Sequence, residues 1–117
     1  MRRGQVLEFA NGGQALLVPW RDHPVAALVL QYRVGSRHES PTESGLAHLL
    51  EHLTFKGLTG WPEGSIDRAC AELGGSLNAM TDLDSTVYHY VLPGDGWRQC
   101  AEIEAARMGS CSFSSRA

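Results

Sequence analysis

The sequence predicts an α+β fold, with an antiparallel or mixed sheet that carries its helices on one face. Segments 25–34 and 85–91 are rich in β-branched and aromatic residues, which is typical of strands. Segments 44–57 and 65–73 place apolar residues at helical spacing, and a third helix is expected from Asp95 to Met108. Because turn signals separate these segments, we expect one sheet of about four to five strands.

The first strands are expected to form a hairpin that is followed by a central strand. Asn11-Gly12-Gly13 is a turn signal between two short apolar segments, 6–9 and 15–18. The run from Val25 to Val34 is long and apolar, as expected for a strand in the centre of a sheet. A further short strand is expected at 76–80, just before the strand at 85–91.

The first two helices are expected to begin and end at capping residues. Ser44 is a suitable N-cap for the first helix and Gly57 is a suitable stop. Ser65 is placed to cap the second helix, which Gly74-Gly75 ends. A stripe of leucines follows one side of the first helix, and we expect this stripe to anchor the helix to the core. Its members are Leu46, Leu49, Leu50 and Leu53.

Length and charge exclude several classes of protein. The chain has 117 residues, enough for one small domain, and its formal net charge of −3 does not favour nucleic acid as a partner. No apolar run approaches the ~20 residues needed to cross a bilayer. The start of the chain also lacks the apolar stretch of a secretory signal, which favours a cytoplasmic location. The three cysteines are too far apart to predict a thiolate zinc site.

The main chemical signal is the motif His48-Leu49-Leu50-Glu51-His52. At roughly 100° per residue, His48, Glu51 and His52 share one face of a helix, nearly opposite the leucines. Two imidazoles at i and i+4 can bind one zinc ion, and a carboxylate beside them can take a proton from the attacking water. The alternative is a solvated polar helix face that happens to carry two histidines.

Flanking residues decide between these interpretations. Val34-Gly35-Ser36-Arg37 and Glu39 precede the motif, and Phe55-Lys56-Gly57 follows it. The segment 74–81 and then Asp84, Thr86, Tyr88 and Pro93 come further on. In order and spacing, the stretch from about Val6 to Met108 resembles the M16 metallopeptidases, which include pitrilysin, insulin-degrading enzyme and the mitochondrial processing peptidases. His-x-x-Glu-His is the inverted zincin order.

This resemblance implies a zinc-dependent endopeptidase that cleaves extended peptides. His48 and His52 would be the zinc ligands, Glu51 would be the general base, and Asn78 and Ala79 would lie on the strand that contacts the peptide. Residues 1–108 would be a partial N-terminal domain, and the serine-rich residues 109–117 a divergent tail. The other histidines that suggest ligands, His38 and His89, match no family ligand.

Family members take a third zinc ligand, a glutamate, from a helix beyond the end of this sequence, and Glu102 and Glu104 do not match it. A C-terminal domain or partner subunit that closes over the substrate would also be needed. Three interpretations follow: an incomplete and inactive fragment of a peptidase, a non-catalytic partner subunit, or a free-standing metal-binding domain. The serine-rich ending favours the first, and retention of all three motif residues argues against the second. The sequence does not indicate which peptides would be cleaved.

Overall fold

A three-stranded antiparallel sheet forms the centre of the computed structural model, which describes residues 3–58 and 60–109. Its strand order is β3 (Val25–Tyr32), β7 (Thr86–Pro93) and β6 (Ser76–Thr81). Strand β7 is therefore the central strand, and the expectation that segment 25–34 would be central is wrong. Residues of β3 alternate between exposed and half-buried, so its continuous apolar run does not reflect burial on both faces.

Two further strand pairs complete the β structure of the described residues. Strands β1 (Gln5–Glu8) and β2 (Gln14–Leu17) form the expected hairpin. Strands β4 (Gly57–Leu58) and β5 (Trp61–Pro62) form a small pair that the sequence did not predict. The described residues thus form one three-stranded sheet and two separate pairs, instead of one sheet of four to five strands.

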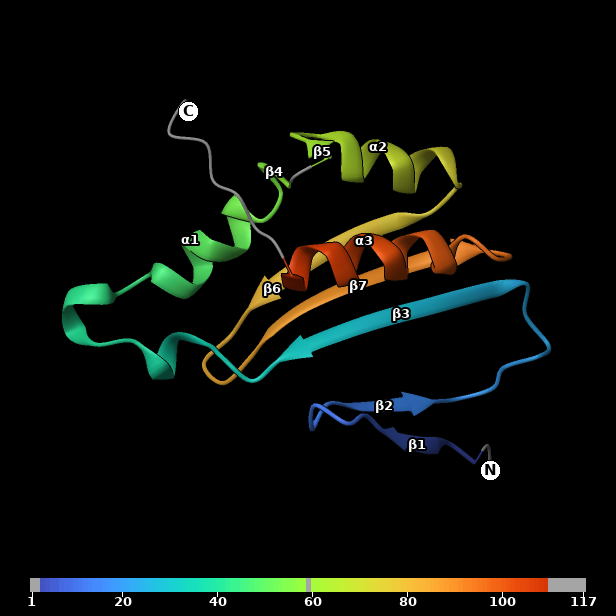
Figure 1. Ribbon diagram of the computed structural model, residues 1–117, viewed down its shortest axis with the longest axis horizontal. Helices are drawn as coiled ribbons and strands as arrows, with labels where there is room; N and C mark the ends of the chain where they lie inside the picture. Colours follow the sequence, from blue (N-terminus) through green and yellow to red (C-terminus); the bar gives the residue numbers. More distant parts are fainter. Residues whose placement is uncertain (1–2, 59, 110–117) are drawn as a thin grey trace.

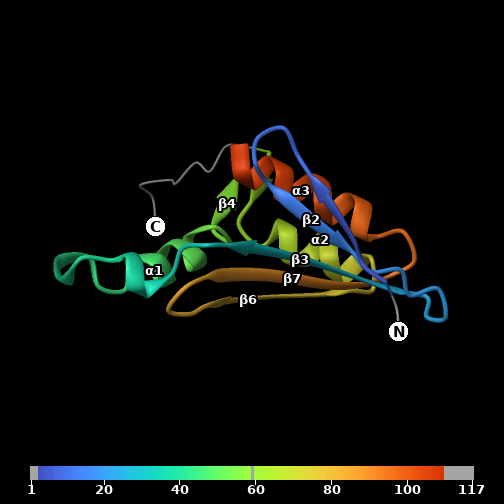
Figure 2. The same cartoon turned by 90° about the horizontal axis from the view of Figure 1, so that it is seen from below.

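Two helices cover one face of the central sheet, which confirms the predicted α+β class. They are α2 (Ser65–Glu72) and α3 (Trp97–Gly109), and Figure 2 shows both on the same side of the β3–β7–β6 sheet. The core lies between these helices and β7, where two clusters of side chains are buried: Cys70, Tyr90, Leu92 and Cys100, and Ile66 with Ile103. Both described cysteines are free thiols. None of the described helices is long and apolar enough to span a bilayer.

Helix α3 ends close to residue 108, where the sequence placed the end of the domain. The helix was expected to stop at Met108, and it continues by one residue to Gly109. The rest of the predicted serine-rich tail, 110–117, lies outside the described residues.

Helix α1 (Leu46–Leu53) has the opposite orientation to the one expected from its leucine stripe. Leu46, Leu49 and Leu50 are 51%, 53% and 48% exposed, whereas Glu51 is only 8% exposed. Figure 1 shows α1 beside the end of β6, and the polar face of the helix is the one that contacts this strand. The expectation that the leucines anchor α1 to the core is therefore wrong for these three, whereas the fourth, Leu53, is half-buried.

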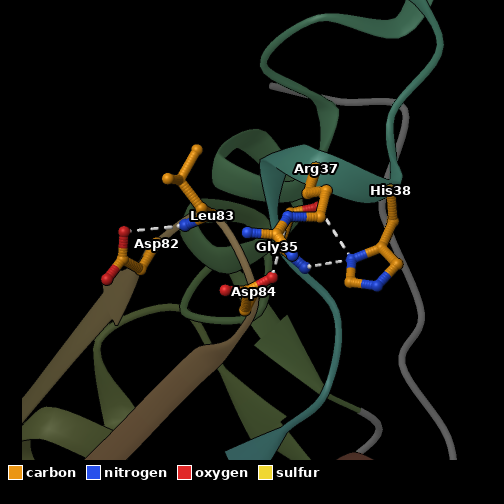
Figure 3. A network of polar contacts seen from close by, with 6 residues as sticks. All are labelled: Gly35, Arg37, His38, Asp82, Leu83 and Asp84. Carbon is orange, nitrogen blue, oxygen red and sulfur yellow. Dashed lines mark hydrogen bonds and ion pairs between the residues drawn. The ribbon is translucent and has the colours of Figure 1, made fainter.

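The loop before α1 is clamped onto the turn between β6 and β7, as Figure 3 shows. The amides of Ser36 and Arg37 donate to the carbonyls of Asp82 and Leu83 over 3.0 and 2.9 Å, and the Arg37 side chain forms an ion pair with Asp84. Gly35 is buried at the start of this clamp, where a Cβ atom would lie 2.2 Å from the carbonyl oxygen of Asp82. The close approach of two backbone segments therefore requires glycine at this position.

A buried polar network joins α3 to the central strand. The Tyr90 hydroxyl donates to the Glu104 carboxylate, and Arg107 Nη1 lies 3.0 Å from the same carboxylate. The Arg107 guanidinium also lies over the rings of Tyr88 and Phe55, 4.8 and 5.1 Å from their centroids. Burial raises the pKa of the Glu104 carboxyl, whereas the hydrogen bond from Tyr90 and the charge of Arg107 act in the opposite direction.

Replacement of Gly35 by alanine is expected to lower the unfolding free energy by about 1–3 kcal/mol, because the added methyl group forces the clamp apart. Urea unfolding measures the change. Gly109→Ala is the matched control, since no atom of the described residues lies within 4 Å of a Cβ there, and it should stay within about 0.5 kcal/mol of the wild type. A Gly35→Ala variant as stable as the control would contradict the clamp.

Glu104→Gln is expected to destabilise the fold by roughly 3 kcal/mol, because it removes the charge partner of a buried guanidinium. The double variant Glu104→Leu/Arg107→Met should lose less stability than the single variant, since it removes both buried charges together. Chemical denaturation of the wild type, the single variant and the double variant tests this order. A double variant that is less stable than Glu104→Gln would show that the pair itself stabilises the fold.

Candidate metal centre

Helix α1 brings the three predicted site residues together. Among the described residues, His48, Glu51 and His52 are the one group of three metal-ligating side chains, and their ligand atoms all lie within 4.8 Å of one another. The two histidines are exposed, and their rings meet edge to face with Nε2 atoms 3.0 Å apart. The helical spacing alone places these two nitrogens side by side.

The donor set fits a zinc ion. A tetrahedral ion about 2.0–2.1 Å from each imidazole nitrogen would separate the two nitrogens by roughly 3.3 Å, close to the spacing observed. Imidazole is a ligand that zinc commonly takes, and the carboxylate of Glu51 lies within reach of the same point. The arrangement supplies two nitrogen ligands and one oxygen atom that can either bind the metal or accept a proton.

The start of α1 is held by a residue whose role sequence reasoning missed. The N-cap is Gly45, with φ of 88°, and not Ser44 as expected. The Glu39 carboxylate accepts hydrogen bonds from the amides of Gly45 and Ala47, both over 2.7 Å. An acidic group at a helix N-terminus satisfies free amides and favours the helix dipole. Glu39 lies too far from the helix in sequence for a local capping pattern to reveal it.

The end of α1 is tied to the central strand. The Thr54 hydroxyl donates to the carbonyl of Glu51 over 2.6 Å and lies 3.2 Å from the Tyr88 hydroxyl of β7. Thr54 and Tyr88 also line a cavity of about 390 Å³, together with Arg107 of α3. Its other lining residues include Tyr32, Val34, Ala47 and Leu50. The helix is thus positioned at both ends by polar contacts with other segments.

Strand β6, which the polar face of α1 contacts, also holds the Glu51 carboxylate. The Thr81 hydroxyl, at the end of β6, donates to Glu51 Oε2. Thr81 was not among the predicted site residues. No motif spacing signals the contact, because 30 residues separate the two partners and only the tertiary fold brings them together.

The strand predicted to contact a peptide lies at the edge of the sheet. Strand β6 pairs with β7 on one side, with Asn78 opposite His89, and no described strand pairs with its other side. The Asn78 side chain is exposed and its Oδ1 accepts a hydrogen bond from the Ala79 amide over 2.9 Å. The free edge that the prediction required is therefore present.

The other acidic and imidazole groups lie outside the cluster. Glu104 is buried against Tyr90, and Glu102 is exposed on α3, so neither joins His48 and His52 in one group of ligand atoms. His38 accepts a hydrogen bond from the Gly35 amide as part of the clamp. His89 occupies the middle of β7.

Known proteins resemble this chain over most of its length. The family model described as insulinase (peptidase family M16) matches residues 18–116. Zinc protease PqqE of Helicobacter pylori is 37% identical over 104 residues, which are 88% of this chain and 23% of that protein. Mitochondrial-processing peptidase subunit beta of Blastocladiella emersonii is 40% identical over 88 residues, which are 73% of this chain and 18% of the relative.

Solved structures give the same result. A protease from Helicobacter pylori superposes with a TM-score of 0.93 at 32% identity, covering 97% of this chain and 28% of that one. Pitrilysin superposes with a TM-score of 0.82 at 27% identity, covering 92% of this chain and 12% of pitrilysin. The chain therefore spans about a quarter or less of the proteins compared here. The match of fold, motif and sequence along nearly the whole chain shows that it belongs to the insulinase family of zinc proteases, peptidase family M16.

Proposed function

We propose that this chain carries the zinc-binding part of a peptidase active site that hydrolyses bonds in extended peptides. The observation that supports it most is the cluster of His48, Glu51 and His52, whose ligand atoms lie within 4.8 Å of one another. Membership of a family of zinc proteases supports the same reaction.

Each residue of the cluster has a distinct role in this proposal. His48 and His52 hold the ion through their Nε2 atoms, which already lie 3.0 Å apart. When bound, zinc would supply Lewis-acid activation of water and of the peptide carbonyl. Glu51 is the general base: its Oε2 is engaged by Thr81, so Oε1 is the atom that takes the proton from the attacking water.

The substrate in this proposal is a peptide that adds as a strand to the free edge of β6. Strand addition grips backbone amides and carbonyls, so it tolerates varied side chains. Asn78 and Ala79 lie on this strand, three and two residues before the Thr81 that contacts Glu51. A peptide on this edge would therefore pass close to the base.

The complete site needs groups that the described residues do not supply. A catalytic zinc normally has three protein ligands, and the cluster offers two histidines besides the base. We propose that a further domain or partner subunit provides the third ligand and covers the substrate, as the greater length of the relatives suggests. The half-exposed leucines of α1 would pack against the same additional structure.

The alternative is a non-catalytic relative that acts as a partner subunit or a metal-binding domain. Calorimetric titration with zinc tests the half-site directly. The chain is expected to bind one zinc ion, and His48→Ala should weaken binding by at least about tenfold because it removes one of two imidazole ligands. His23→Ala, in an exposed turn, is the matched control and should leave the affinity unchanged. Equal affinities for both variants would exclude the proposed site.

The isolated 117-residue chain is expected to show negligible peptidase activity. It lacks a third protein ligand among the described residues, and loss of even one transition-state donor typically costs roughly 10²–10³ in rate. The assay compares zinc-dependent cleavage of an unstructured peptide by the chain and by its Glu51→Gln variant. Clear cleavage that disappears in the variant would show that this chain, or a second copy of it, completes the site.

A further inference from the structure

The geometry of the cluster leaves two roles open for Glu51. Its carboxylate lies within 4.8 Å of both histidine ligand atoms, close enough to share one ion with them. The same closeness allows it to act as a base for water beside the ion. A carboxylate that binds the metal directly loses much of its ability to accept a proton, so an enzyme of this design must keep the two roles apart.

Thr81 is placed to decide which of these two roles Glu51 takes. Its hydroxyl donates to Glu51 Oε2, and a hydrogen bond to a charged acceptor is stronger and more directional than one between neutral groups. Glu51 is only 8% exposed, so solvent cannot easily replace this donor. The contact therefore fixes the direction in which the carboxylate points.

The hydroxyl is presented from a rigid part of the sheet. Thr81 pairs with Thr86 across the β6–β7 hairpin, and the turn between them is closed by a 2.8 Å hydrogen bond from the Asp82 amide to the Ser85 carbonyl. The clamp from Ser36 and Arg37 holds the same turn from outside (Figure 3). Movement of the Glu51 carboxylate toward the histidines would break its hydrogen bond with Thr81, because these backbone contacts hold Thr81 in place.

We propose that Thr81 is a positioning residue that holds Glu51 Oε2 away from the metal, so that Glu51 acts as a base and not as a ligand. This inference rests on the proposed function, because it assumes an ion between His48 and His52. It adds that β6 serves the site twice: its free edge faces the substrate and its last residue orients the base.

The test uses the full 117-residue chain with cobalt(II), whose visible absorption reports the number and type of its ligands. Thr81→Val removes the hydroxyl at nearly constant shape, and Thr81→Ser keeps it. Thr81→Val is expected to bind cobalt about tenfold more tightly and with an altered spectrum, because the released carboxylate becomes a third protein ligand. Thr81→Ser should retain the wild-type affinity and spectrum. Circular dichroism confirms that each variant is folded, and Thr81→Ala replaces Thr81→Val if the latter is not.

The variant Glu51→Gln shows whether the effect of Thr81→Val on cobalt binding depends on the Glu51 carboxylate. In the double variant Thr81→Val/Glu51→Gln, both the gain in affinity and the altered spectrum should disappear. The inference is overturned if Thr81→Val matches the wild type, if Thr81→Ser behaves like Thr81→Val, or if the change persists in the double variant. A wild-type chain that binds no cobalt at the histidines would overturn the proposed function itself, a result distinct from the other three.

Discussion

The contact between Glu51 and β6 determines how α1 lies on the sheet. A buried carboxylate is costly unless hydrogen bonds replace the water it loses, and here Thr81 supplies one of them. The rest of the helix is positioned in the same way: Glu39 binds its first amides and Thr54 ties its end to Tyr88. Polar contacts at defined points, and not burial of an apolar stripe, orient this helix within the described residues.

This arrangement explains why the leucines of α1 point outward. A helix can turn only one face toward the sheet, and α1 turns the face that carries His48, Glu51 and His52 toward β6 and its free edge. Leu46, Leu49 and Leu50 are then exposed and Leu53 is half-buried, and Leu50 lines a cavity of about 390 Å³. Exposed apolar patches of this kind are typical of interaction surfaces. The site and the uncovered surface are two sides of one helix.

The sequence predicted local features well and tertiary relations poorly. Periodicity located α1 and α2, a capping residue indicated α3, and a turn signal indicated the hairpin. The motif placed His48 and His52 side by side because helix geometry alone brings residues i and i+4 together. The sequence could not show which strand is central, because both β3 and β7 are apolar enough to occupy that place. Strand order depends on pairing between segments that are distant in the sequence. The orientation of α1 was predicted wrongly because the contact between Glu51 and Thr81 turns the polar face of the helix toward β6, and no local sequence pattern signals that contact. Thr81 left no signal because its role depends on one long-range contact.

The two functions proposed for the motif therefore depend on different levels of structure. The nitrogen pair of His48 and His52 is created by one turn of helix, so it forms wherever α1 forms. The position of Glu51 is created by tertiary contacts among α1, the end of β6 and the clamp that begins at Gly35. Damage to the clamp would therefore displace the Glu51 carboxylate while leaving the histidine pair intact. Under the proposed function such a protein would still bind metal but would have lost its correctly placed base, which makes the β6–β7 turn as much a part of the candidate site as the motif itself.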